Sequence, residues 1–258
     1  MESMNRPDNI VIPEQFRGPP MSGNGGYVCG VFAGQLLRRQ NNLDENQAIE
    51  VTLRAPTPLD KPLQVVHEDD QLRVMDAETL VADAVPATLE LEIPEPPSWD
   101  EALAAQSNSL SFQPRLNPII PEGTGFHPIC FCCGADVPEG EGLRVFCAPV
   151  QNNEQVAAAW QPHESFGDEN GYLLPEHMWT ALDCPGQFAY MAGNVRTGML
   201  GRLTARIEKP IKVEERCLVT GWRIETIGRR HFAGTALFNA AGECCAYAKA
   251  IWVAFKPK

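Results

Sequence analysis

The chain lacks any apolar run near the roughly 20 residues that a membrane-spanning helix requires. Its beginning, MESMNRPDN, has neither the basic end nor the apolar stretch of a secretory signal. Both absences favour a cytoplasmic protein that spans no membrane. Among its 258 residues, 44% are hydrophobic and 21% are charged, which is typical of a globular protein.

Positive charge is scarce in the first half of the chain. Residues 1–128 carry 8 basic and 19 acidic side chains, whereas residues 129–258 carry 13 and 14. Nucleic acid is therefore not expected as a partner, because binding it requires a basic surface. Basic residues are concentrated in the segment from Arg196 to Arg230, which contains nine basic and four acidic residues. These are either solvated strand faces or a site for an anionic ligand such as a CoA phosphate, with Arg229 and Arg230 as candidates.

The nine cysteines are an odd number and lie in apolar segments such as CCAYAKAIW. This pattern favours reduced, buried thiols over a disulfide framework. His127, Cys130, Cys132 and Cys133 form one cluster that could suggest a metal. Zinc sites commonly use two spaced cysteine pairs, and no second pair stands at a matching distance. The sequence therefore predicts no metal site.

Residues 94–128 are rich in Pro, Ser and Asn and show no sustained periodicity, apart from a short helix expected around Trp99 to Gln106. We interpret them as a linker between two domains, residues 1–93 and residues 129–258.

The two halves repeat one order of elements. In the first, a helix is expected over 27–37, followed by strands at 49–54, 63–67, 72–76 and 79–85. In the second, strands at 143–148 and 155–160 precede one apolar helical segment, and strands follow at 200–207, 217–226, 231–238 and 243–255. Strands that follow one another without helical crossovers pair antiparallel. The expected class is α+β, with one apolar helix and a run of antiparallel strands in each half.

Two segments of the second half carry a family resemblance: HPICFCCGADVPEGEGLRVFCA at 127–148 and LPEHMWTALDCPG at 174–186. They resemble hotdog-fold thioesterases related to the phenylacetate-pathway and human thioesterase-superfamily proteins. The match spans about residues 127–255, and residues 16–86 echo it more weakly. The resemblance implies an α+β double hotdog, which is two tandem repeats, each a long central helix wrapped by an antiparallel sheet.

In the family pattern, a His-Gly-Gly turn starts the helix and an acidic residue follows nine positions after the His. The first half keeps the turn, as Asn-Gly-Gly at 24–26, and has Ala33 at the acidic position. The second half has Leu-Pro-Glu at 174–176 and keeps the acid, Asp183. Nine residues rise about 13 Å along a helix, too far for both features to reach one carbon atom. The turn of one half must therefore act with the acid of the other.

The resemblance implies acyl-CoA thioester hydrolysis at one composite site. Backbone amides of Gly25 and Gly26 would stabilise the charge that develops on the carbonyl oxygen. Asn24, which replaces the family's His, would orient the turn. Asp183 would activate water as a general base or attack the carbonyl itself. CoA is part of the substrate, so no separate cofactor is implied.

Simpler interpretations stand beside this one. Residues 23–26, Gly-Asn-Gly-Gly, are also an ordinary turn sequence, and Asp183 precedes Cys-Pro-Gly as a helix N-cap would. Glu176 and His177 are spare acid-base candidates or surface residues. A non-catalytic module that binds acyl-CoA or acyl carriers is the main alternative function. Enoyl-CoA hydration or dehydration is less favoured, because no Asp–His pair precedes either helix. Homo-oligomer formation is left open.

Overall fold

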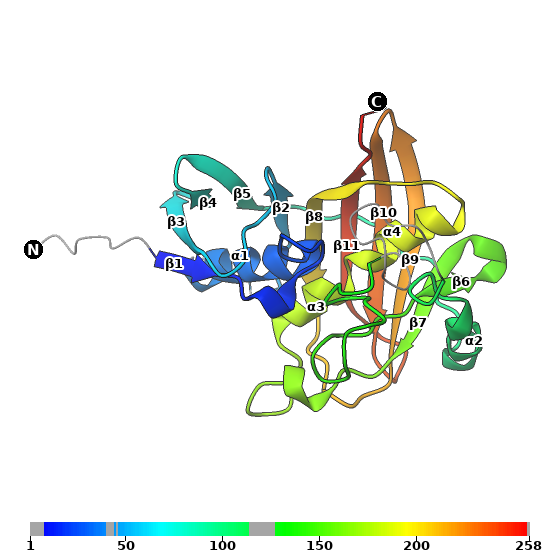
Figure 1. Cartoon of the computed structure of the whole chain (residues 1–258). Coiled ribbons are helices and arrows are strands. Elements are labelled where there is room, and N and C mark those ends of the chain that lie inside the picture. The colour runs from blue at the N-terminus through cyan, green and yellow to red at the C-terminus, as the bar shows by residue number, and fades with distance from the viewer. Residues whose placement is uncertain (1–7, 40–43, 45, 114–126, 257–258) are drawn as a thin grey trace, which may run out of the picture.

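In a computed structural model of the chain, which describes residues 8–39, 44, 46–113 and 127–256, eleven strands form one antiparallel sheet (Figure 1). The first half contributes β1 (Asp8–Val11), β2 (Ile49–Leu53), β3 (Pro62–Glu68), β4 (Gln71–Asp76) and β5 (Thr79–Pro86). The second half contributes β6 (Ala148–Val150), β7 (Gln155–Trp160), β8 (Met199–Ile207), β9 (Cys217–Ile227), β10 (Arg230–Phe238) and β11 (Cys244–Val253).

The strand order of the two halves is the same when read outward from the centre of the sheet. It runs β2-β5-β4-β3-β1 on one side and β8-β11-β10-β9-β7 on the other, with β6 at the edge. β2 and β8 pair antiparallel at the centre, with Thr52 opposite Arg202. The expected α+β class and tandem arrangement are confirmed. The domain limits at residues 93 and 129 stay predictions.

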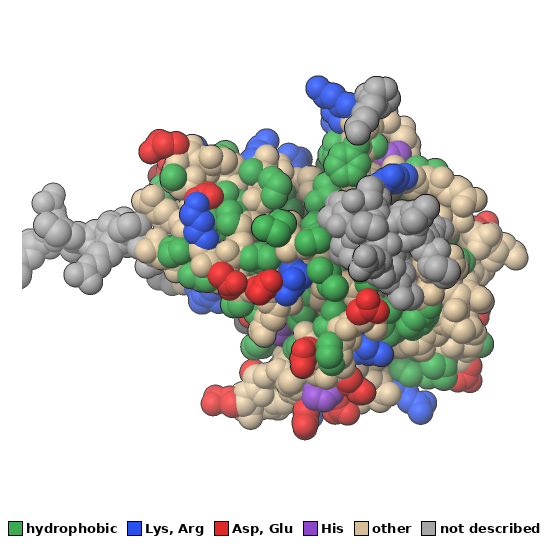
Figure 2. Space-filling view, in the orientation of Figure 1, with side chains coloured by type: hydrophobic (Ala, Val, Ile, Leu, Met, Phe, Trp, Pro, Cys, Tyr) green, Lys and Arg blue, Asp and Glu red, His purple; other side chains and the backbone are tan. Residues whose placement is uncertain are grey.

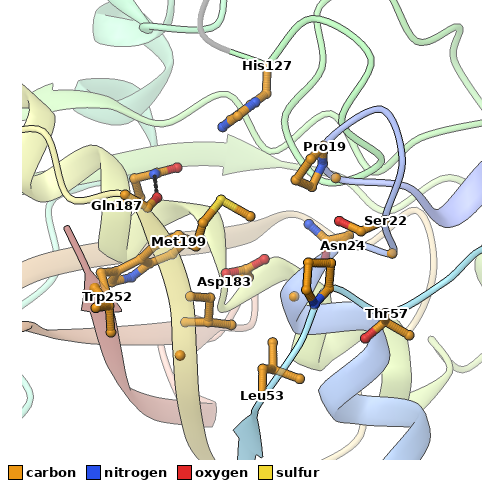
Figure 3. Close-up of a pocket in the computed structure, with 18 of the residues that line it drawn as sticks. Pro19, Ser22, Asn24, Leu53, Thr57, His127, Asp183, Gln187, Met199 and Trp252 are labelled. Atoms are coloured by element: carbon orange, nitrogen blue, oxygen red, sulfur yellow. Dashed lines mark hydrogen bonds between the residues drawn. The ribbon is translucent and has the colours of Figure 1, made fainter. Parts of the chain in front are cut away.

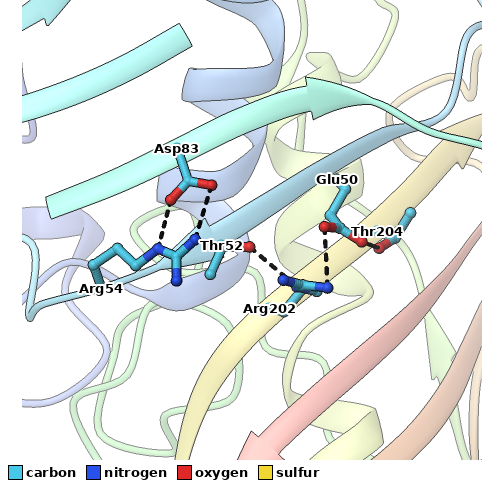
Figure 4. Close-up of polar contacts among 6 residues, drawn as sticks. All are labelled: Glu50, Thr52, Arg54, Asp83, Arg202 and Thr204. Atoms are coloured by element: carbon cyan, nitrogen blue, oxygen red, sulfur yellow. Dashed lines mark hydrogen bonds and ion pairs between the residues drawn. The ribbon is translucent and has the colours of Figure 1, made fainter. Parts of the chain in front are cut away.

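Polar side chains cross the central β2–β8 pair (Figure 4). Arg202 Nη1 lies 3.1 Å from Glu50 Oε1, and Arg202 Nε donates to Thr52 Oγ1 at 3.0 Å. Thr204 Oγ1 donates to the same Glu50 carboxylate at 3.4 Å. The Arg202 and Glu50 side chains are partly exposed, so their ion pair contributes at most about 1 kcal/mol. The backbone ladder and the buried faces hold the halves together.

Helices α1 (Gly25–Arg39), α3 (Pro175–Ala181) and α4 (Cys184–Ala192) cover one face of the sheet (Figure 1). Helix α2 (Trp99–Ala105) packs on the opposite face near the β6 edge, where Ala102 joins a separate apolar cluster with Ala157 and Leu218. Single 3₁₀ turns lie at Glu14–Phe16, Gln106–Asn108, Gln151–Asn153 and Glu164–Phe166. α1 packs against α3, with two glycines at the contact. A Cβ on Gly26 would lie 2.6 Å from the Trp179 carbonyl oxygen, and one on Gly30 would lie 2.7 Å from Glu176 Cα. The two backbones can approach this closely only without side chains.

The single helix expected in the second half is instead two helices, α3 and α4, that meet at Asp183. The N–H of Leu182 closes α3 on the carbonyls of Met178 and Trp179. Pro185 has no N–H with which to continue the ladder, so a new helix starts at Cys184. The break moves the Asp183 carboxylate out of a regular helical position.

Two strand predictions need correction. The strand expected at 143–148 is wrong for residues 143–147, because the N–H groups of Leu143 and Val145 bond to the carbonyls of Phe131 and Cys132 in a neighbouring turn. Strand β1, with only four residues, was not predicted. No helix in the described part of the chain is long and apolar enough to cross a membrane.

Candidate functional site

Asp183 lies at the junction of α3 and α4, and its side chain turns toward the first half of the chain. Its Oδ2 accepts the backbone N–H of Gly26 at 2.9 Å. It occupies the N-cap position of α4 but makes no side-chain cap to that helix. Oδ1 has no hydrogen-bond partner among the described residues, and Asp183 as a whole is only 2% exposed. Gly26 therefore holds Oδ2, whereas no described residue gives Oδ1 the hydrogen bond that a buried polar atom usually has.

The start of α1 supplies the other part of the site. Asn24 Oδ1 accepts the N–H of Tyr27 at 2.9 Å, so Asn24 is the N-cap of α1. Asn is one of the residues preferred at this position. The N–H of Gly26 is taken by Asp183. The N–H of Gly25 has no protein partner in the described ranges, and Gly25 lines a cavity. Gly25 and Gly26 were expected to act together, but within the described residues only the Gly26 N–H is occupied by a protein partner.

Burial raises the pKa of the Asp183 carboxyl from 3.8 to about 7. The N–H of Gly26 opposes this shift, the nearby Cys130 thiol adds to it, and the Asn24 amide opposes it more weakly. A carboxyl that titrates near neutral pH can accept a proton and release it again.

The cavity, of about 440 Å³, opens between the two halves (Figure 3). Asp183 lies near its centre, between Asn24 and Met199. Leu53, Met199, Leu200 and Trp252 supply apolar wall, and Ser22, Asn24, Thr57, Asp183 and Gln187 supply polar groups. Such a mostly apolar cavity with a few convergent polar groups is the usual form of a small-molecule site.

Three cations border this cavity: Arg54, Arg229 and Lys256. Arg54 is engaged by Asp83 at 2.6 Å, and Arg229 Nη1 donates to the Ala254 carbonyl at 2.8 Å. Arg230 lies outside the cavity lining, with its guanidinium over the Phe232 ring. Basic side chains are scattered on the face shown in Figure 2, without one continuous patch.

Gln187 was not singled out from the sequence. It lies on α4, four positions after Asp183, and both residues line the cavity. The residue is 2% exposed, and its Nε2 donates to Thr197 Oγ1 at 3.2 Å and to the Gly198 carbonyl at 3.0 Å. These bonds fix the Gln187 amide in the cavity wall (Figure 3). The four-residue spacing was a signal that could have found it.

Comparison with known proteins finds no matching family model and no matching curated protein. Solved structures do match along the full length. A protein of Novosphingobium aromaticivorans, provisionally called a thioesterase, has a TM-score of 0.62 at 10% identity, with 99% of this chain and 98% of that chain covered. A hot dog fold protein of unknown function from Alicyclobacillus acidocaldarius has a TM-score of 0.58 at 11% identity, with 100% and 96% covered. The chain has the double hotdog fold.

A protein of Thermobifida fusca, provisionally called a thioesterase II, shares this fold as well. Its TM-score is 0.58 at 11% identity, with 92% of this chain and 89% of that chain covered. At these identities the double hotdog fold itself is what the structures share. The residues of the site must be judged from this chain.

The start of α3 is the counterpart, in the second half, of the start of α1. Side chains fill the space beside it. His177 is buried there among the rings of Phe16, Tyr27, Phe131 and Phe166. Burial lowers the pKa of His177 to about 4, so its ring is neutral at physiological pH. The interpretation of His177 as a surface residue is wrong. Glu176, beside it, is partly exposed and is absent from the cavity lining.

Proposed function

We propose that the protein is an acyl-CoA thioesterase-like hydrolase with one composite site between its halves. The contact of Gly26 with Asp183 across the two halves is the observation that carries the proposal. It places an ionisable carboxyl beside a cavity that Gly25 also lines. The second half supplies the acid and the first half supplies the helix start, as the family resemblance implies.

In the proposed reaction, ionised Asp183 removes a proton from a water molecule as the water oxygen attacks the thioester carbonyl carbon. The carbonyl π electrons move to the oxygen, which the Gly25 N–H at the start of α1 stabilises together with the helix dipole. The C–S bond then breaks, and the proton held by Asp183 passes to the departing CoA thiolate. Asn24 acts by capping α1 and so positioning the Gly25 amide.

We assign the general-base role to Asp183 rather than the nucleophile role. Its Oδ2 is already engaged by Gly26, which leaves Oδ1 to accept the proton of the water. Its pKa of about 7 is suited to proton transfer near neutral pH.

Binding of the two ends of the substrate follows from the cavity lining. The apolar wall that includes Leu53, Leu200 and Trp252 would receive the acyl chain. Arg229 and Lys256 at the border would attract the phosphates of CoA. Arg230, the other candidate from the sequence, would act only through its charge near the entrance.

The experiment that tests the function is a thiol-release assay with acyl-CoAs from acetyl to palmitoyl and with aromatic acyl-CoAs. We expect turnover of at least one class, since the cavity is largely apolar. If every ester binds, as followed by calorimetry, and none is cleaved, the proposal fails and the protein is a non-catalytic acyl-CoA-binding module.

A further inference from the structure

Three thiols outside the proposed reaction converge beside the cavity. The Sγ atoms of Cys130, Cys133 and Cys184 all lie within 4.8 Å of one another, and those of Cys130 and Cys184 are 3.8 Å apart. Their residues are 2%, 2% and 4% exposed. Two come from the turn that opens the second half, and the third is the first residue of α4. Residues from separate segments thus present sulfur to one point.

The turn that carries two of these thiols is a tight Cys-x-x-Cys-Gly loop. The N–H of Gly134 donates to the Cys130 carbonyl at 2.7 Å. A Cβ on Gly134 would lie 2.5 Å from the Pro128 carbonyl oxygen, so a residue with a side chain does not fit. The turn therefore holds Cys130 and Cys133 on one side of a closed loop.

Hydrogen-bond donors surround the Cys130 sulfur. Asn24 Nδ2 lies 3.6 Å from it, and the backbone N–H of Cys133 and the thiols of Cys133 and Cys184 also point to it. Cys184 stands at the N-terminus of α4. Metal ions bind cysteine in its thiolate form, and binding displaces the thiol protons.

The spacing of the sulfurs is close to that of a tetrahedral metal centre. A Zn–S bond of about 2.3 Å places two sulfurs of a tetrahedron roughly 3.8 Å apart. The Cys130–Cys184 separation is 3.8 Å, and the Cys133 sulfur lies within 4.8 Å of both. Cys132, which lies between the two ligands of the turn, instead donates to the Thr180 carbonyl at 3.2 Å.

We propose that Cys130, Cys133 and Cys184 bind one thiophilic divalent cation, with zinc as the natural candidate. Cys130 and Cys184 both line the cavity, so water or an anion from the cavity can take the fourth position. The cation would fasten the turn at 130–134 to α4. Through Asn24 and the Cys184 neighbour Asp183, it would also fix the wall of the proposed site.

The test uses full-length protein purified in reductant and stripped of metal with a chelator, to which Co²⁺ is then added. We expect one ion per chain, with sulfur-to-cobalt charge-transfer absorption and the intense visible bands of tetrahedral cobalt. Zinc should displace the cobalt and erase these bands. Folding of the metal-free protein is checked by circular dichroism before the titration.

Matched serine variants identify the ligands. Cys133→Ser and Cys184→Ser should lose the charge-transfer bands, whereas Cys217→Ser, a buried cysteine of β9 outside the cluster, should keep them. Folded, reduced wild-type protein without sulfur-to-cobalt absorption would overturn the proposal. So would bands that persist in both ligand variants. Because the readout is the cobalt spectrum, the result does not depend on whether the protein cleaves thioesters.

Discussion

The backbone N–H of Gly26 donates to Asp183 Oδ2 at 2.9 Å, although the two residues are 157 positions apart in the chain. The carboxylate is thus held by the helix of the other half and not by the helix that it precedes. This relationship makes one site from two incomplete halves. The corresponding position at the start of α3 is occupied by the ring of His177 and its aromatic neighbours.

The two glycines of the turn should respond differently to alanine. A Cβ on Gly26 would lie 2.6 Å from a backbone oxygen of Trp179, whereas one on Gly25 meets the end of the Leu200 side chain at 2.7 Å. We expect Gly26→Ala to lower the free energy of unfolding by about 1–3 kcal/mol, and Gly25→Ala to lower it less, since Leu200 can move. Urea unfolding measures both. Equal losses would argue against the close contact of α1 with α3.

The buried Asp183 carboxyl should make stability depend on pH in the metal-free protein. Because its pKa is raised from 3.8 to about 7, folding favours the neutral acid. This contribution is complete below pH 3.8 and is lost as the pH rises through 7. Asp183→Asn cannot ionise, so its stability relative to wild type should grow across that range, by up to about 4 kcal/mol. Urea unfolding at several pH values checks this, and a difference independent of pH would refute it.

Arg229 and Arg230 are neighbours with equal charge, and only Arg229 lines the cavity. We expect Arg229→Gln to raise KM for the cleaved acyl-CoA about tenfold, equivalent to roughly 1.4 kcal/mol, with little change in kcat. Arg230→Gln is the matched control and should change KM much less. Steady-state kinetics at low salt, where surface charges are least screened, provides the measurement. Equal effects of the two variants would remove Arg229 as a specific phosphate contact.

A single turnover in water enriched in ¹⁸O separates the two roles open to Asp183. With enzyme in excess over substrate, general-base catalysis puts the heavy oxygen directly into the released acid. Nucleophilic attack by Asp183 would instead expel the thiolate and form a mixed anhydride. Water that opens this anhydride at the aspartyl carbon leaves the heavy oxygen in Asp183 and a light oxygen in the acid released in the first turnover. We expect the labelled acid by mass spectrometry. Unlabelled acid would show that Asp183 attacks the carbonyl carbon itself.

Local patterns predicted most of the sheet correctly. In β2, apolar Ile49 and Val51 alternate with Glu50 and Thr52, and strands of this kind were placed within a residue or two of their bounds. β1 escaped because four residues are too short for a period to be visible. The segment at 143–147 alternates as a strand does, but its N–H groups bond to a turn. Tertiary contacts decided these cases.

The sequence predicted those features of the site that depend on neighbouring residues. It did not predict those that depend on contacts between segments far apart in the chain. The break at Asp183 had a signal in Pro185, two positions later. No signal in the sequence distinguished the roles of the Gly25 and Gly26 amides, because these roles depend on the contact of α1 with α3. Cys184 lies 51 positions after Cys133, so no spacing in the sequence marked it as a partner of the cysteines at 130–133.

The central claim is that the Asp183 carboxyl performs the chemistry. The most direct test compares thiol release by Asp183→Asn with wild type and with Glu176→Gln, which removes a carboxyl from the same pair of helices outside the cavity. We expect Asp183→Asn to lower kcat between about 100- and 10,000-fold while the protein still folds and binds acyl-CoA, and Glu176→Gln to retain near wild-type turnover. Unchanged thiol release by folded Asp183→Asn would contradict the account.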